Sequence, residues 1–180
     1  MRLQLPKNKT HGHFKRKLTA NHRFGFYPQP NLSKYLVLKK RIRINEGFRN
    51  TAYLDSLGFA TIGYGHLIKT SEKHLLKGRF SKKFLLKYFY LDFNLALEGY
   101  EKLYKKYNYR QHIREALIEM IFQIGISKQK NFMQMNKYIK NNHLFMAALE
   151  MKDSLWYKQT PKRVGLLTNI LLKKQYEKKG

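Results

Sequence analysis

Residues 51–68 constrain the fold most, because their pattern favours β-strands whereas most of the remaining chain favours helices. β-Forming residues precede and follow a turn at residues 55–58, and Gly63 and Gly65 stand where a strand can bend. This pattern predicts a small antiparallel sheet. The expected fold class is therefore α+β and mostly α, with one small antiparallel sheet.

Helices are expected on both sides of this sheet, because apolar residues recur there at helical spacing. Gly47, Gly78 and Gly125 are placed to end helices, and Pro161 is placed to begin one. The segment 154–161 that leads to this proline is expected to form a turn. The predicted helices span residues 34–45, 71–78, 81–105, 113–124, 132–139, 144–151 and 161–172.

The length of 180 residues favours one domain, or one domain with two lobes. The helix predicted at residues 81–105 would be about 35 Å long, which is enough to connect two lobes. We expect a small β-containing lobe at about residues 46–80. A helical lobe should follow at about residues 106–175, and the first helix, residues 34–45, should pack with it.

Residues 1–33 differ from the rest of the chain, because they show no helical or alternating period and contain no acidic residue. We expect a basic, flexible N-terminal arm here. Its three histidines lack the spacing of a metal-ligand motif, and solvated residues are the simpler interpretation. The absence of cysteine excludes disulfides and thiolate metal sites. We therefore expect no cofactor and no metal.

The charge of the chain is strongly positive, since 37 lysines and arginines against 11 aspartates and glutamates give a formal charge of +26. Such a charge favours anionic partners, namely nucleic acid, anionic lipid or the polymers of bacterial walls. A general preference for lysine codons explains part of it, but not the lack of acids before Glu46. No apolar run reaches the length of about 18 residues that a membrane helix needs.

Glu46 and Asp55 are noteworthy in a chain with so few acids, because they stand nine positions apart around a turn. Glu46 is expected at the C-terminal end of a helix, where the helix dipole raises the pKa of a carboxyl group. Glycoside hydrolysis uses a protonated acid together with an ionised carboxylate. Glu46 suits the first role and Asp55 the second, although two ordinary surface carboxylates remain the alternative on this pattern alone.

Several separated motifs, in the right order, resemble the phage-type lysozymes, and closely the lysozymes of T-even phages. The resemblance covers about residues 34–172 and implies a lysozyme domain at residues 34–180 with a two-lobed fold. The motifs are Glu46-Gly47, Tyr53, Asp55, Gly58, the run at residues 61–67, the run at residues 122–125 and the run at residues 156–163.

The resemblance implies a role for each matching residue. Glu46 would be the general acid, Asp55 the second catalytic carboxylate, and Thr61 would help to place the attacking water, with inversion at the anomeric carbon. Leu67, Phe122 and Gln123 would line the substrate cleft, although core packing explains Phe122 equally well.

Three further residues would support the site. The resemblance implies that Asp92 pairs with His66 and raises its pKa, although an unpaired surface His66 is the alternative. Arg163 would reach toward Glu46 across the boundary between the lobes and would oppose the rise in its pKa. The chain departs from the family at Met135 and Glu150, where the family has a hydroxyl residue and an amide that contact the substrate. Trp156 is expected in the core.

The leading hypothesis is a muramidase that cleaves the β-1,4 bond between N-acetylmuramic acid and N-acetylglucosamine in peptidoglycan, acting as a bacteriolytic endolysin or an antibacterial effector. The sequence shows no signal peptide, so we expect synthesis in the cytoplasm, export by a holin or another route, and action as a monomer at the periplasmic wall. We expect no specific nucleic-acid binding, but contact of the arm with anionic membranes. The alternatives are a catalytically weak protein of this fold that binds wall polymer or nucleic acid, and a membrane-active arm on a folded domain.

Overall fold

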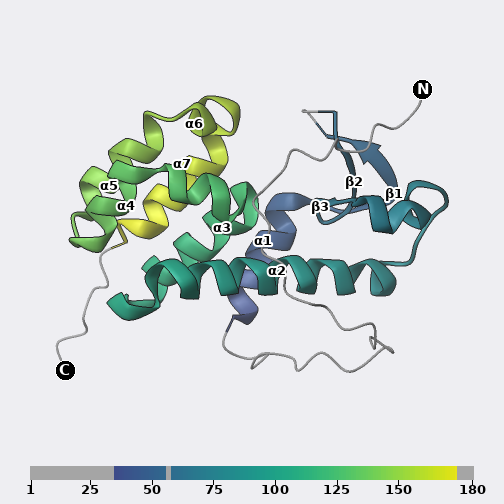
Figure 1. Ribbon diagram of the computed structural model, residues 1–180, viewed down its shortest axis with the longest axis horizontal. Coiled ribbons are helices and arrows are strands. Elements are labelled where there is room, and N and C mark those ends of the chain that lie inside the picture. The colour runs from purple at the N-terminus through teal and green to yellow at the C-terminus, as the bar shows by residue number, and fades with distance from the viewer. Residues whose placement is uncertain (1–34, 56–57, 174–180) are drawn as a thin grey trace. The chain divides into compact units, whose positions relative to one another are not determined.

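The computed structural model describes residues 35–55 and 58–173 (Figure 1). Within these ranges it shows α-helices, two 3-10 helices and a three-stranded sheet, which confirms the mostly helical α+β fold class. The contacts divide the chain into two compact units between Phe89 and Tyr90, inside one continuous helix, α2. The predicted arm at residues 1–33 lies outside the described residues. The packing of the first helix on the helical lobe stays a prediction.

The first unit is built from a helix and the sheet. Helix α1 ends at Gly47, whose backbone N–H donates to the carbonyl of Arg43 and whose φ of 70° is readily adopted only by glycine. The strands form an antiparallel sheet in the order β1-β2-β3, with a bulge in the pairing between Arg49 and Tyr53. The elements are α1 (Leu36–Glu46), β1 (Arg49–Leu54), β2 (Ala60–Gly63), β3 (His66–Leu67), the 3-10 helix η1 (Thr70–Leu76) and the first part of α2 (Lys82–Tyr104).

The core of the first unit lies where α1, the sheet and α2 each turn apolar residues inward. Strand β2 is buried along its whole length, as expected of a central strand in a small sheet. Helix α2 begins after Ser81, whose Oγ accepts a hydrogen bond of 3.1 Å from the backbone N–H of Phe84. The fully buried apolar side chains include Leu38, Ile42, Ile62, Ile68, Leu75, Leu85 and Phe89.

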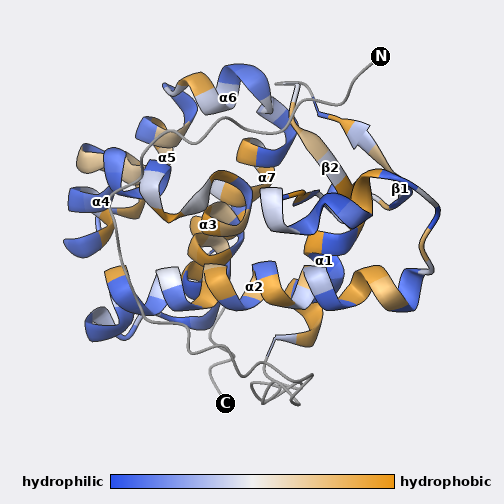
Figure 2. Ribbon diagram, turned by 45° about the vertical axis from the view of Figure 1, so that its right-hand side comes forward, coloured by the Kyte–Doolittle hydropathy of each residue, from blue (hydrophilic) through white to orange (hydrophobic). Residues whose placement is uncertain are grey.

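The second unit is built around helix α3, which is largely hydrophobic in Figure 2. Every residue of α3 from Glu115 to Ile121 is buried. Gly125, with φ of 77° and ψ of 157°, interrupts the helical backbone of α3, where the sequence predicted a helix end. Helix α7 begins with Pro161. The elements that follow α2 are the 3-10 helix η2 (Lys105–Tyr107), α3 (Gln111–Asn131), α4 (Met133–Lys140), α5 (Leu144–Lys152), α6 (Leu155–Gln159) and α7 (Pro161–Leu171).

A cluster of polar side chains is buried inside this apolar unit. The Tyr104 hydroxyl donates to Oδ1 of Asn136, and Nε2 of Gln129 donates to the Tyr104 oxygen over 2.7 Å. Asn136 Nδ2 also donates to the backbone carbonyl of Gln129 over 2.8 Å. Burial raises the pKa of Tyr104 to about 12, although the hydrogen bond from Gln129 opposes the rise, so the hydroxyl stays protonated and can donate.

Two local predictions were wrong. The segment predicted as a turn at residues 154–161 contains helix α6, which Ser154 caps by accepting a 3.1 Å hydrogen bond from Tyr157 N–H. Its five residues are too few to show a helical period. The helix predicted near residues 71–78 is a kinked 3-10 helix, with non-helical backbone at Glu72. Within the described part of the chain, no helix combines the length and apolar character needed to cross a bilayer.

Candidate active site

Glu46 is the last residue of helix α1, and its half-buried side chain lies against the turn between β2 and β3. A Cβ atom placed on Gly65 would stand 3.2 Å from Oε2 of Glu46, so the carboxylate rests close over a residue with no side chain. Gly65 has φ of 84°, a conformation that glycine adopts without strain. The strand turn thus provides the space that the Glu46 carboxylate occupies.

Asp55 and Thr61 are both held by the backbone of one residue, Phe59. Asp55 Oδ1 accepts a 2.8 Å hydrogen bond from Phe59 N–H, and the Thr61 hydroxyl donates to the Phe59 carbonyl over 3.2 Å. The backbone N–H of Asp55 also donates to the Phe59 carbonyl, over 2.9 Å. Asp55 therefore opens the turn between β1 and β2, and the turn fixes its carboxylate to the strand that carries Thr61.

Leu67 and His66 form β3, the edge strand of the sheet, and point to opposite faces. Leu67 is 42% exposed, whereas His66 is 3% exposed. Thr61 pairs with Leu67 across the two strands, so these two predicted site residues are neighbours. The first unit therefore contains five predicted site residues, which are Glu46, Asp55, Thr61, His66 and Leu67.

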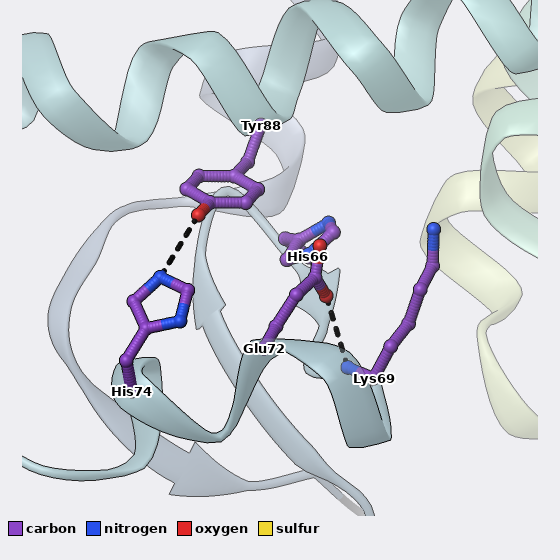
Figure 3. A network of polar contacts seen from close by, with 5 residues as sticks. All are labelled: His66, Lys69, Glu72, His74 and Tyr88. Carbon is purple, nitrogen blue, oxygen red and sulfur yellow. Dashed lines mark hydrogen bonds and ion pairs between the residues drawn. The ribbon is translucent and has the colours of Figure 1, made fainter. Parts of the chain in front are cut away.

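The structure gives His66 a carboxylate neighbour that the sequence did not suggest. Nε2 of His66 lies 3.0 Å from Oε2 of Glu72, and the same carboxylate oxygen accepts a 3.0 Å hydrogen bond from Lys69 N–H (Figure 3). The Tyr88 ring of α2 lies beside the His66 ring with 4.8 Å between centroids, and its hydroxyl is 3.3 Å from Nε2 of His74. This network joins β3, η1 and α2 behind the candidate site.

The pKa of Glu72 is lowered, although burial alone would raise it. The hydrogen bond from Lys69 N–H and the contact with His66 outweigh the burial. A carboxyl group whose pKa is lower in the folded than in the unfolded state stabilises the fold above its unfolded pKa. The contribution of Glu72 to stability is therefore present at neutral pH and is lost as the pH falls through the folded pKa.

Replacing Glu72 with glutamine is expected to lower the free energy of unfolding at pH 7 by about 1 kcal/mol, because the amide can still accept from Lys69 N–H but no longer carries the charge beside His66. This loss of stability should become smaller as the pH falls below about 4.5, the ordinary pKa of a glutamate side chain. Urea unfolding of Glu72→Gln and wild type between pH 3 and pH 7 measures this. The matched control is Glu98→Gln on the exposed side of α2. An equal loss of stability at pH 3 and pH 7 would contradict a stabilising role of the ionised Glu72 carboxylate.

The remaining predicted residues belong to the second unit. Phe122, Gln123 and Arg163 are half-buried, and Asp92 lies on α2 just after the division between the units. The amide atoms of Gln123 are buried without a hydrogen-bond partner among the described residues. The pairing of His66 with Asp92 and the reach of Arg163 toward Glu46 would each join the two units, and both stay predictions.

The buried residues of the second unit also bear on the departures from the family. Met135 is 1% exposed and belongs to the core, whereas Glu150 on α5 is half-buried. A side chain as buried as Met135 offers no surface to a ligand in this structure. Trp156 is 9% exposed and packs edge-on against Phe132, with 6.2 Å between ring centroids, which confirms its place in the core.

Sequence reasoning missed two residues of the site. Glu72 was treated as part of a helix start, although a carboxylate six positions after a strand histidine could have signalled a pair. Gly65 was assigned to strand bending, and its closeness to Glu46 follows only from the fold. Among the described residues, no group of three or more histidines and acids could hold a metal ion.

Comparison with known proteins places this geometry in a family. The phage lysozyme family matches residues 43–171. Probable T4-type lysozyme 2 of Dictyostelium discoideum is 32% identical over 156 residues, covering 74% of this chain and 92% of that protein. Probable T4-type lysozyme 1 of the same organism is 28% identical over 157 residues, with the same coverage of 74% and 92%. The match extends over the sheet, the long helix and the helices that follow, and the chain belongs to the phage lysozyme family.

Proposed function

We propose that the protein is a muramidase that hydrolyses the β-1,4 bond between N-acetylmuramic acid and N-acetylglucosamine in peptidoglycan. The observation that carries the proposal is the attachment of Asp55 and Thr61 to the backbone of Phe59, in a member of the phage lysozyme family. This attachment holds a carboxylate and a hydroxyl in fixed positions on one strand turn. The names of the relatives, both probable T4-type lysozymes, agree with this proposal.

In the proposed reaction Glu46 donates its proton to the glycosidic oxygen as the bond to the leaving sugar breaks. The Thr61 hydroxyl already donates a hydrogen bond to the Phe59 carbonyl, so its oxygen is left to accept a hydrogen bond from the attacking water. The Asp55 carboxylate accepts one proton from this water as the water oxygen attacks the anomeric carbon. Attack by water from the face opposite the leaving group inverts the anomeric configuration.

We further propose that Leu67, Phe122 and Gln123 contact the glycan. Leu67 supplies exposed apolar surface, 42% accessible, beside Thr61. The buried amide of Gln123 has no partner among the described residues, and an unsatisfied polar group of this kind costs about 1–3 kcal/mol. A hydrogen bond between this amide and an acetamido group of the substrate would recover this cost.

The test of the proposal is digestion of purified peptidoglycan with product analysis. We expect soluble fragments with muramic acid at the new reducing ends, and no methyl glycoside when methanol is added, because an inverting enzyme forms no glycosyl-enzyme intermediate. Glu46→Gln protein purified in parallel excludes a contaminating hydrolase. Release of no fragments by the wild type would overturn the proposal. New reducing ends that carry N-acetylglucosamine would overturn the proposed bond specificity. Formation of methyl glycosides would overturn the proposed inversion.

The formal charge of +26 supports the anionic bacterial wall as the partner and the site of action. It equally favours the alternative, a weakly catalytic protein that binds wall polymer or nucleic acid. Binding to wall fragments without release of soluble product would support that alternative. Attraction between exposed charges weakens with salt, so we expect wall binding to decrease between low ionic strength and about 0.5 M salt.

Replacing Gly65 with alanine is expected to reduce hydrolysis about tenfold and the free energy of unfolding by about 1–2 kcal/mol. The new Cβ would meet Glu46 Oε2 at 3.2 Å and would sit on a backbone with φ of 84°. Rates on peptidoglycan and urea unfolding measure the two effects. Gly165→Ala in helix α7, where a Cβ has nothing within 4 Å, is the matched control and should be neutral or stabilising. Unchanged hydrolysis by Gly65→Ala would refute the close contact with the acid.

A further inference from the structure

A pocket of about 590 Å³ lies in the second unit, whereas Glu46, Asp55 and Thr61 all belong to the first. Its wall combines the turn after η2, the start of α3, the turn between α4 and α5, and the end of α7. Its volume falls in the range of about 300–1,000 Å³ that is typical of small-ligand sites. None of the roles proposed for catalysis uses this pocket.

Cationic side chains from three segments line the pocket. Arg110 precedes α3, Lys140 ends α4 and Lys173 follows α7. No aspartate or glutamate is among the described residues that line it. Like charges held around one cavity repel each other, and a bound anion would replace this repulsion with attraction.

His112 lies in the wall of the same pocket, and its pKa responds to the positive charges there. Burial lowers its pKa, and the charges of Arg110 and Lys173 lower it further, while Glu115 opposes them only in part. Its Nδ1 atom is buried and has no hydrogen-bond partner among the described residues. An anion in the pocket would counter the two cations and raise the pKa of His112.

The rest of the wall suits an uncharged part of a ligand. Tyr107 and Tyr109 stack with 5.6 Å between ring centroids, and the hydroxyl of Tyr109 donates to the carbonyl of Ile139 over 3.0 Å, which fixes its ring. Asn108 and Asn142, with φ of 42° and 60°, are the non-glycine residues of positive φ in the described chain, and both line the pocket. Ile113, Leu144 and Leu171 add an apolar side.

We propose that this pocket binds a phosphate ester, with the phosphate between Arg110, Lys140 and Lys173 and its organic part against the apolar side. A phosphate ester suits three cations better than a carboxylate does, because it offers more acceptor oxygens and, as a monoester, can carry two negative charges. Phosphate esters reach such a site either as small free molecules or as units of a wall polymer.

The experiment is NMR titration of the full-length wild type with inorganic phosphate, glycerol 3-phosphate and purified wall teichoic acid, at constant ionic strength. We expect saturable shifts of the His112 signals and a higher pKa for His112 in the bound state. Glycerol 3-phosphate should bind several-fold more tightly than inorganic phosphate, because its glycerol part adds van der Waals contacts with the wall of the pocket. Tighter binding of teichoic acid than of glycerol 3-phosphate would identify the polymer as the source, and the reverse order would identify the small ester.

Two double variants of equal charge test the location. Lys140→Gln/Lys173→Gln should weaken binding at least about tenfold, because two of the three cations are lost. The control is Lys128→Gln/Lys152→Gln, whose two positions are exposed and lie outside the pocket. Its affinity for the phosphate ester should stay within about twofold of the wild-type affinity if the charges that line the pocket determine binding. Equal weakening in both variants, or equal shifts with chloride in place of phosphate, would overturn the proposal. Both variants should hydrolyse purified glycan strands at the wild-type rate, so failure here is distinct from failure of the muramidase proposal.

Discussion

Replacing Glu46 with glutamine should lower the rate of peptidoglycan hydrolysis by a factor of about 10² to 10⁴, the range that general acid catalysis contributes. Glutamine has the size and shape of glutamic acid, so it keeps the space over Gly65. Its amide cannot transfer a proton to the glycosidic oxygen, and the leaving sugar must then depart as an unprotonated alkoxide. Release of soluble fragments from purified peptidoglycan measures the rate.

The control for this variant is Glu98→Gln, which makes the same chemical change at an exposed position of α2. It should hydrolyse peptidoglycan at the wild-type rate. Thermal unfolding of the Glu46→Gln protein should show an intact fold. The loss of activity can then be attributed to the missing carboxyl group and not to unfolding. If Glu46→Gln keeps more than about a tenth of the wild-type rate, Glu46 is not the general acid.

Replacing Asn136 with alanine should lower the free energy of unfolding by about 3 kcal/mol or more, the second large effect that the structure predicts. The substitution removes the acceptor of the Tyr104 hydroxyl and the donor to the Gln129 carbonyl, in surroundings where Tyr104 is fully buried. Buried groups that lose their partners keep the full cost of their removal from water. Urea unfolding followed by circular dichroism measures the change.

Two variants define the origin of this loss. Asn131→Ala, at an exposed position at the end of α3, should change stability by less than about 0.5 kcal/mol. The triple variant Tyr104→Phe/Gln129→Leu/Asn136→Leu should recover much of the loss, because it leaves no orphaned side-chain donor or acceptor in the cluster. The Gln129 carbonyl still accepts a hydrogen bond from Phe132 N–H. If the triple variant is no more stable than Asn136→Ala, lost packing rather than lost hydrogen bonding explains the effect.

Local chemistry made part of this fold predictable from sequence. Gly47 ends α1 and Pro161 begins α7 because each has a backbone preference that acts within one turn. Helix α6 escaped notice since it is shorter than the window in which a helical period can be seen, although its cap, Ser154, was a usable signal. Asp55 was singled out as one of few acids, placed at a turn, and Thr61 was found through the resemblance, whereas their shared attachment to Phe59 follows only from the structure.

Contacts between distant residues could not be predicted in this way. Tyr104, Gln129 and Asn136 lie on three different helices, and a polar residue in a helical pattern is ordinarily assigned to the solvent side. The resemblance implied a partner for His66 on α2, and the structure shows in addition Glu72 on the kinked 3-10 helix, with 3.0 Å between Nε2 of His66 and Oε2 of Glu72. The non-helical backbone at Glu72 has no signature in the residues themselves.

The continuous helix α2, Lys82–Tyr104, contains the division between the two units, and this limits how the protein can be cut or evolve. Phe89 and Phe93 lie on either side of the division, and each is at most 1% exposed. A proteolytic fragment or a gene fusion that separated the units at this point would cleave a helix in mid-course and would expose apolar surface on both products. Unlike proteins whose parts are joined by a loop, this chain offers no peptide bond at the boundary that a protease could reach without first unwinding a turn of helix. Exchange of one unit between relatives would therefore have to conserve the register of α2, and insertions are better tolerated in the turns at its two ends.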